Sequence, residues 1–443
     1  MIRAIWITIA LVSSSLVCEA QGTTAKATVF DAGREGPAKP LTLEEAEAIG
    51  LRNNPQISVG KLKALQSQEF VREARSALLP TANLSATAVD SREGSRIAAG
   101  YLNNPTIYPR AAAGASVSQL ITDFGRSTSL LSSAKFQAKA EDENALATAQ
   151  QIVLAVDEAF YNSLETKALL GVAKETVEAR QLLVDQVQAL TNAKLRSDLD
   201  LSFSNVDLSR AKLLFLEAQN NYEASLSTLS AILGYPDLQN FQPVEPQVKE
   251  VAPEVEATPL IRKALEQRPE VLGMESEVLS SEKFGKAEHD LWWPTVSAAG
   301  VVGIAPVRDN HIDNWYGAVG VNVNIPVFNG FLFNARAKVA DLQTEVQRKR
   351  LQELQNSIAR DVRNGWLDSK KAFARLTVTR ELRQQASLAL ELAQARYKLG
   401  LSSIVEFSQA ELQKTDAELQ DTDAHYQYLI TQIVLAYEMG EKR

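Results

Sequence analysis

The residue types that most often carry out chemistry are few and scattered in this chain. The three histidines, His289, His311 and His425, stand far apart and lack metal-ligand spacing to one another or to the single cysteine, Cys18. Neither a phosphate-cradling GxxxxGK(S/T) loop nor a GxSxG nucleophile motif occurs. The sequence therefore supports no metal site, cofactor or catalytic residue, and we expect the chain not to be an enzyme.

The charge and the hydropathy argue against a nucleic-acid-binding protein and against a protein that crosses a membrane through helices. A net charge of -8 over 443 residues argues against nucleic-acid binding, because a phosphate-binding surface needs clustered Lys and Arg. The apolar content of 45% and the aromatic content of 7% are typical of a soluble protein. Beyond the N-terminus there is no run of about 18 uncharged apolar residues, so any membrane crossing must use strands.

The first twenty residues are typical of a secretory signal. An early cation, Arg3, precedes an apolar stretch, and small residues lead to a cleavage site after Ala20. This cut would remove Cys18. Lipidation of Cys18 is the alternative, which the sequence disfavours because Leu16 stands one place too late and bulky Val17 stands where a small residue is expected. Residues 21–40 are then expected to form an extended segment.

The remainder of the chain is a duplication. Residues 51–57 are echoed 214 positions later by residues 265–271, and both segments keep a proline at the same place. A helix face repeats as well, at a slightly shorter offset: Tyr222, Leu226, Leu229 and Leu233 match Tyr426, Ile430, Ile433 and Tyr437. We expect structural repeats at 41–234 and 259–440, joined by an extended, proline-rich surface connector at 235–258 that is not a packed element.

Each repeat contains a long tract without proline that is rich in helix formers. The tracts lie between Pro109 and Pro236 and after Pro326, and each has one weak place near its middle where a helical hairpin can reverse. A helix over about 330–398 would be roughly 100 Å long. The expected helices span about 124–191, 200–233, 330–398 and 402–438.

Two segments with period-two alternation precede each long tract. The expected strands cover about 81–93, 110–122, 294–306 and 315–327, with small apolar residues alternating with small polar ones. Such alternation suits a sheet with one face toward lipid and one toward water. Aromatic residues near the strand ends suit belts at the two membrane interfaces. These are Tyr101, Tyr108, Trp315 and Tyr316 near the hairpin loops, and Trp292 and Trp293 at the opposite ends.

Four strands are too few to close a membrane barrel, because the smallest such barrels have about eight. An open edge in hydrocarbon leaves backbone groups unpaired, so several copies must share one wall. Three copies would give a twelve-stranded barrel continued by an α-helical tunnel, a mainly α fold with a membrane β-barrel. The competing hypothesis is a periplasmic coiled-coil scaffold or adaptor in which the same segments form a small soluble sheet.

The order of elements, the duplication and the tract Ala395–Leu401 leading into Ile404-Val405-Glu406 resemble the TolC-like outer-membrane efflux family. The resemblance covers roughly residues 41–440. It implies a homotrimer in outer-membrane lipid of a Gram-negative bacterium, with its helices in the periplasm. It also implies docking to a periplasmic adaptor protein and an inner-membrane pump, in tripartite efflux or type I secretion.

The resemblance also implies roles for the two hairpin ends. The small-Gly-Leu turn that meets the adaptor in this family is similar to Leu399, Gly400 and Leu401, and the first-repeat turn reads Leu195, Arg196 and Ser197, without the glycine. Adaptor contact is therefore expected at these six residues, with a weaker match at the first turn.

The resemblance to this family also implies which residues lie at a closed aperture. Tyr397 matches the family's locking tyrosine, whereas Ser402 and Ser202 stand where its charged partners would be. Glu406 matches an acidic position that rings the lumen, and Gln409 replaces a second one. A ring of three carboxylates repels itself and attracts cations, so Glu406 is expected to be a cation-sensitive element. Asp198 and Asp200 offer either a further ring or simple helix caps.

Overall fold

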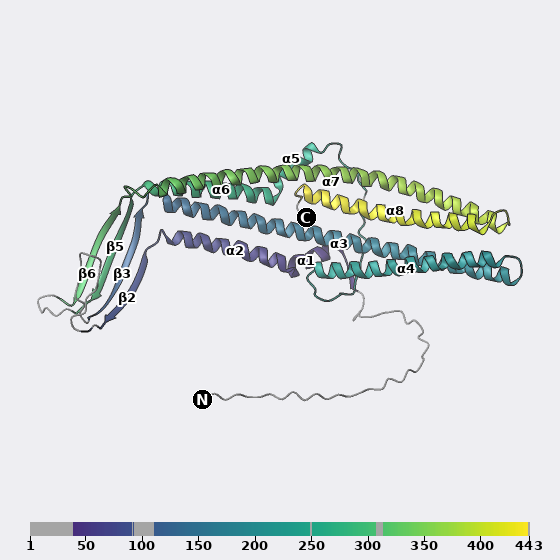
Figure 1. Cartoon of the computed structure of the whole chain (residues 1–443), viewed down its shortest axis with the longest axis horizontal. Helices are drawn as coiled ribbons and strands as arrows, with labels where there is room; N and C mark the ends of the chain where they lie inside the picture. The colour runs from purple at the N-terminus through teal and green to yellow at the C-terminus, as the bar shows by residue number, and fades with distance from the viewer. Residues whose placement is uncertain (1–38, 91, 93–109, 249, 307–312, 442–443) are drawn as a thin grey trace, which may run out of the picture.

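The computed structural model describes residues 39–90, 92, 110–248, 250–306 and 313–441, which form one long, narrow molecule (Figure 1). A small sheet stands at one end, and helices run from it to the opposite end. The expected signal segment, Cys18, His311, Tyr101 and Tyr108 lie outside the described residues. No helix among the described residues combines the length and the apolar character needed to cross a membrane.

The sheet has four antiparallel strands in the order β2-β3-β5-β6. Their bounds are β2 Thr81–Val89, β3 Arg110–Thr122, β5 Thr295–Ile304 and β6 Trp315–Asn324. Three strands are shorter than expected. Proline explains two of them, because Pro294, Pro306 and Pro326 flank β5 and β6 and have no N–H for a ladder. β2 ends before Asp90, a residue type that is depleted in strands.

Two helical hairpins make up most of the molecule. α3 Arg126–Asn192 and α4 Asp198–Ile232 form the first, and α7 Leu332–Lys398 and α8 Ile404–Glu438 form the second. α3 and α7 have 67 residues each, so each is roughly 100 Å long. The start and the end of each of these four helices lie within two residues of the expected positions.

Four shorter helices were not expected from the sequence. They are α1 Leu43–Asn53, α2 Pro55–Ser76, α5 Thr258–Gln267 and α6 Pro269–His289, followed by a single 3-10 turn, η1 Asp290–Trp292. Pro55 and Pro269 each occupy the first turn of a helix, where the missing N–H costs nothing. The repeated prolines therefore begin helices. In the described residues α2 lies in line with α4, and α6 in line with α8 (Figure 1).

The connector is packed against the helices, contrary to the expectation of an unpacked surface segment. It contains β4 Phe241–Pro243, which pairs in parallel with β1 Lys39–Leu41. Phe241 is buried in the main apolar cluster, with Phe160, Leu229 and Tyr428 among its members. The Tyr428 hydroxyl donates to the Val251 carbonyl (2.6 Å). The connector is therefore held against the helices by the burial of Phe241, by the pairing of β4 with β1 and by the hydrogen bond from Tyr428, in spite of its high proline content.

Candidate functional site

The strand register gathers the alternating apolar residues onto one face of the sheet. Directly paired residues share a face, and Val302 pairs with Gly317, Ala298 with Val321, and Leu84 with Ala115. No described element covers this face: Leu84 is 85% exposed, Val319 90% and Val321 65%. One copy therefore presents an uncovered apolar surface that spans all four strands.

The opposite face of the sheet is small and polar. It carries Asn83, Ser116, Ser297 and Asn322, at paired or neighbouring positions. Tyr316 belongs to this face, because adjacent residues in a strand point to opposite sides and its neighbour Trp315 pairs with Ile304 on the apolar face.

Trp315 and Tyr316 were both expected in a belt at the membrane interface, but only Trp315 lies on the apolar face of the sheet. The Tyr316 hydroxyl lies where a side chain on Gly303 or Gly114 would begin, 2.6 Å from a Cβ placed on either glycine. Glycine at these two positions leaves room for the Tyr316 ring to lie across the small polar face. Trp315 remains a candidate for the lipid-facing belt.

Aromatic residues gather where the sheet meets the helices. Trp293 stacks on Phe124 with ring centroids 5.6 Å apart, and Trp292 meets Phe333 edge-on at 5.5 Å. Phe124 and Phe331 have positive φ values of 55° and 65°, a conformation that bulky residues rarely adopt. Trp292 and Trp293 are expected belt residues, whereas the phenylalanines are not among the residues predicted from the sequence. Their signal is the Phe-Gly or Asn-Gly turn before each long helix.

The two hairpin turns at the other end have the same backbone. Lys194 and Gly400 both have positive φ, 60° and 73°. Leu195 N–H donates to the Leu190 carbonyl and Leu401 N–H to the Arg396 carbonyl, each at 2.9 Å. Lys194 is therefore the counterpart of Gly400. This finding corrects the sequence match, which set Leu195-Arg196-Ser197 against Leu399-Gly400-Leu401. Leu195, Leu399 and Leu401 are all exposed.

Tyr397 is buried between the two hairpins. Its ring stacks on Phe407 of α8 with centroids 5.4 Å apart and planes 7° apart. The Arg196 guanidinium of the first hairpin lies over the same ring, with Cζ 4.3 Å from the centroid, and donates to the Tyr397 carbonyl at 3.2 Å. Burial raises the pKa of Tyr397, and the Arg196 charge opposes that rise. An arginine partner for the tyrosine is thus present, from a position that the sequence comparison did not indicate.

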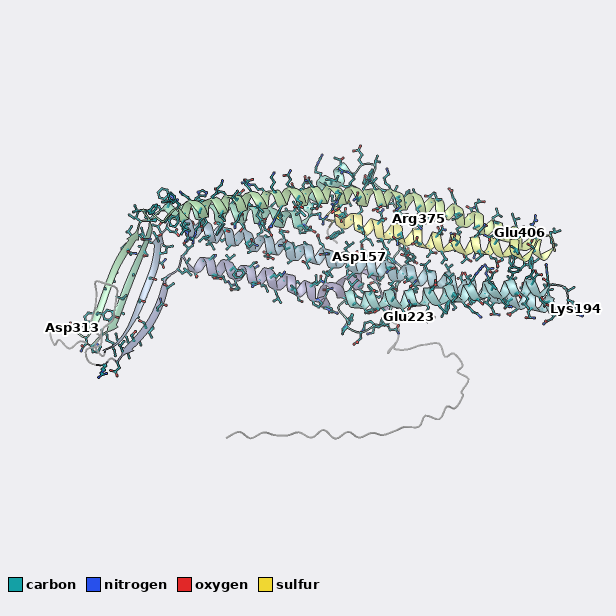
Figure 2. The ribbon with its side chains drawn as sticks, viewed as in Figure 1. Asp157, Lys194, Glu223, Asp313, Arg375 and Glu406 are labelled. Atoms are coloured by element: carbon teal, nitrogen blue, oxygen red, sulfur yellow. The ribbon has the colours of Figure 1, made fainter. Side chains whose placement is uncertain are left out.

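The acidic candidates are all near the helix starts at this end, where Figure 2 shows Glu406 and Lys194 far from Asp313 at the sheet. Glu406 lies in the first turn of α8, where Ser403 accepts its N–H, and its carboxylate pairs with Arg396 at 3.2 Å. Asp200 completes a capping box with Ser197.

The remaining candidates at this end are exposed. Asp198 opens α4, and Gln409 lies one turn after Glu406 on α8. The described residues contain no group of three His, Cys, Asp or Glu side chains that could hold a metal ion.

The helices form a curved wall with two different edges. α2 and α4 pack on α3, α3 packs on α6 and α8, and these pack on α7. Figure 1 shows α7 on one side of this wall and α2 with α4 on the other. Both edges expose large apolar side chains. On α4 these are Leu199, Phe203, Val206, Leu213 and Leu216, and on α7 they are Val339, Leu342, Val346, Val378, Leu382, Leu388 and Leu392.

Comparison with known proteins gives a consistent result. The family described as Outer membrane efflux protein matches residues 50–235 and 260–441, one match for each repeat. The outer membrane protein TolC of Escherichia coli is 23% identical over 409 residues, covering 88% of this chain and 80% of TolC. The probable efflux pump outer membrane protein TtgC of Pseudomonas putida is 22% identical over 378 residues, covering 83% of this chain and 76% of TtgC.

Solved structures show the same fold. The CmeC outer membrane channel of Campylobacter jejuni aligns with a TM-score of 0.78 at 18% identity, covering 90% of this chain and 85% of CmeC. The outer membrane protein VceC of Vibrio cholerae aligns with a TM-score of 0.77 at 16% identity, covering 90% of this chain and 96% of VceC. The family match spans most of both repeats, and so this chain belongs to the outer membrane efflux protein family.

Proposed function

We propose that the chain is one subunit of a passive trimeric duct in the outer membrane, which exports substrates without catalysing a reaction. The uncovered apolar face of the sheet carries this proposal. A soluble scaffold would bury Ala82, Val302 and Val321 in its own core, but all three are exposed, Val302 by 57%. A continuous apolar face without a covering layer fits contact with lipid.

The two different edges favour a closed ring of copies. The sheet ends in β2 on one side and β6 on the other, and the helical wall ends in α2 and α4 on one side and α7 on the other. Joining unlike edges gives a head-to-tail interface, which forms a ring when the rotation closes. Three copies would supply twelve strands, enough for a barrel whose small polar face lines the lumen.

The hairpin ends are the proposed docking points for an adaptor protein, through which an inner-membrane pump would supply the energy. Leu195, Leu399 and Leu401 are exposed there. Tyr397 and Glu406, at the same end, would form the aperture. The lumen of small polar residues offers little chemical selectivity, so the substrate would be chosen by the pump.

Membrane extraction followed by a mass measurement tests this proposal. The full-length protein should fractionate with outer membranes, require detergent for extraction and give a mass of three protomers. A monomer in the soluble periplasmic fraction would instead support the coiled-coil scaffold.

A further inference from the structure

A pocket opens in the helical wall where the first repeat meets the second. Its volume is about 370 Å³, within the roughly 300–1,000 Å³ that is typical of small-molecule sites. It is lined by α1 and α3 of the first repeat, by the junction of α5 and α6, and by the last turns of α8. The described residues that line it come from none of the edge helices α2, α4 and α7, so the pocket lies within one copy. We call it the α3 pocket.

The lining of the α3 pocket is both apolar and acidic. Its apolar side chains include Leu146, Ala149 and Val153 of α3, Leu272 of α6, and Ile433 and Ala436 of α8. Glu143, Asp157 and Glu441 also line it, and the described lining residues include no lysine, arginine or histidine. Lys263 Nζ lies 2.6 Å from Glu441 Oε1, so Glu143 and Asp157 carry the acidic character of the lining. The α3 pocket therefore favours a ligand that is apolar and positively charged.

Arg268 lies next to the α3 pocket, but its charge is already balanced. Its guanidinium lies against the Tyr437 ring, with Cζ 5.3 Å from the centroid. It pairs with Glu270 at 3.0 Å and with Glu438 at 2.6 Å. Burial, followed by the charge of Glu270, raises the pKa of Tyr437 to about 12, so the hydroxyl of this lining residue stays protonated. These groups therefore add no net positive charge beside the pocket.

The second repeat has a different surface at the matching positions. α3 and α7 have 67 residues each and begin at residues 126 and 332, so residues 206 apart correspond. At this offset, the buried residues Ile152 and Val156 match the buried residues Ile358 and Val362. The lining residues Glu143, Leu146, Ala149 and Asp157 instead match Lys349, Gln352, Gln355 and Arg363. The fold that the two repeats share therefore does not require an apolar, acidic surface at these positions.

We propose that the α3 pocket binds a small hydrophobic organic cation, with its apolar body against Leu146 and Ile433 and its charge beside Glu143. Burial of the apolar body drives binding. The carboxylates select the sign of the charge, because charges in a partly buried site are screened by salt less than charges on the open surface. The inference goes beyond the duct function and does not depend on it, because the pocket belongs to one copy.

Isothermal titration calorimetry on the purified full-length protein tests the proposal with two probes that share one ring system. The probes are the cation naphthylmethyl-trimethylammonium and the anion naphthalenesulfonate. The wild type should bind the cation saturably, and about tenfold or more tightly than the anion. Glu143→Gln should weaken binding of the cation about tenfold, and Ala149→Trp should abolish it because the indole fills the pocket. Glu141→Gln is the matched control, since Glu141 lies on the same helix but lines a different cavity, against α2. It should bind the cation as the wild type does.

Two kinds of result would overturn the proposal. The first is a wild type that shows no saturable binding of the cation, or that binds the two probes equally well. The second is an unchanged affinity for the cation in Glu143→Gln or in Ala149→Trp, which would place the bound probe elsewhere. Should Ala149→Trp fail to fold, Glu143→Gln decides alone, with Glu141→Gln as its reference. None of these results bears on the duct function, which is tested by extraction and mass.

Discussion

The Glu406 carboxylate forms an ion pair that the sequence did not indicate. Arg396, in the last turn of α7, lies 3.2 Å from its carboxylate, and both side chains are about half exposed. An exposed pair of this kind contributes little to stability. At the proposed aperture, Arg396 would instead offset part of the negative charge that three copies of Glu406 would supply.

We therefore expect Glu406→Gln and Arg396→Gln to change divalent-cation block in opposite directions. Glu406→Gln should raise the blocking concentration by about tenfold, and Arg396→Gln should lower it by several-fold. Single-channel conductance with increasing Mg²⁺ measures both, and Gln409→Ala serves as the uncharged control on the same helix. Unchanged block in Glu406→Gln would remove this residue from the conduction path.

Glu165 is a buried carboxyl at mid-length of the helices. Its side chain on α3 is 9% exposed and hydrogen-bonds Asp423 of α8, and Gln427 donates to it at 3.4 Å. Asp423 also pairs with Arg375 of α7 at 2.6 Å. Burial, followed by the charge of Asp423, raises the pKa of Glu165 to about 7, although Gln427 and Arg375 act against the rise.

This raised pKa predicts that stability falls as pH increases. Below pH about 4.5 Glu165 is protonated in both the folded and the unfolded chain. Between that pH and about 7 only the folded chain retains the proton, so each unit of pH lowers the free energy of unfolding. Glu165→Gln should raise the stability at pH 8 by roughly 2 kcal/mol and leave it unchanged at pH 4.

Thermal melting from pH 4 to pH 8 measures this effect. Glu223→Gln is the control, since Glu223 is exposed on α4 (Figure 2) and should show the wild-type pH profile. An equal shift of the melting temperature at every pH in Glu165→Gln would mean that the proton plays no part.

At the scale of elements, the two hairpin turns offer an internal comparison. Lys194 holds a left-handed backbone that costs an L-residue roughly 1–2 kcal/mol, and Gly400 adopts the same backbone without that cost. Lys194→Gly should therefore stabilise its hairpin by about 1 kcal/mol, and Gly400→Ala should destabilise the other by a similar amount. A Cβ at Gly400 meets no atom within 4 Å, so backbone strain alone would act there. If Lys194→Gly and Gly400→Ala shifted the melting temperature in the same direction, backbone strain at these turns would not explain the effect.

The elements that the sequence predicted are those with a local signal. α3 and α7 follow from long tracts without proline, and β3 from strict alternation between small apolar and polar residues. The start of α4 agrees with the interpretation of Asp200 as a helix cap, because Ser197 followed by Asp200 is a capping pattern and the two residues form a capping box. α2 and α6 are not among the predicted helices, because a proline is ambiguous in sequence: it marks the repeat and also suits the first turn of a helix.

Contacts between distant parts of the chain had no local signal. Arg196 meets Tyr397 across 201 residues, and the Ser408 hydroxyl meets Asp207 across the same separation. These contacts depend on how the two hairpins pack, which the sequence of either hairpin alone does not determine. The fold is therefore more predictable than the contacts at the hairpin ends, because helices and strands follow local periodicity and these contacts follow tertiary packing.

At the scale of the whole molecule, the duplication places unlike edges on the two sides of one copy. The first repeat supplies β2, α2 and α4 at one edge, and the second supplies β6 and α7 at the other, so sheet and helices end at the same two sides. The proposed ring would close both layers with a single kind of interface. The apolar stripes on α4 and α7 and the unpaired strand edges are both expected to become buried in that ring.

The two faces of the sheet can be tested with one substitution on each. Val319→Arg places a charge on the apolar face near the middle of β6, where a lipid-facing arginine costs about 2–4 kcal/mol in every copy. Asn322→Arg places the same charge on the same strand but on the polar face, where water would solvate it. Val319→Arg should abolish trimer recovery from the outer membrane, and Asn322→Arg should leave it near the wild-type level. Fractionation and semi-native electrophoresis measure this recovery. Equal loss of the trimer in both variants would mean that both faces of the sheet contact the same solvent. The uncovered apolar face would then need another explanation.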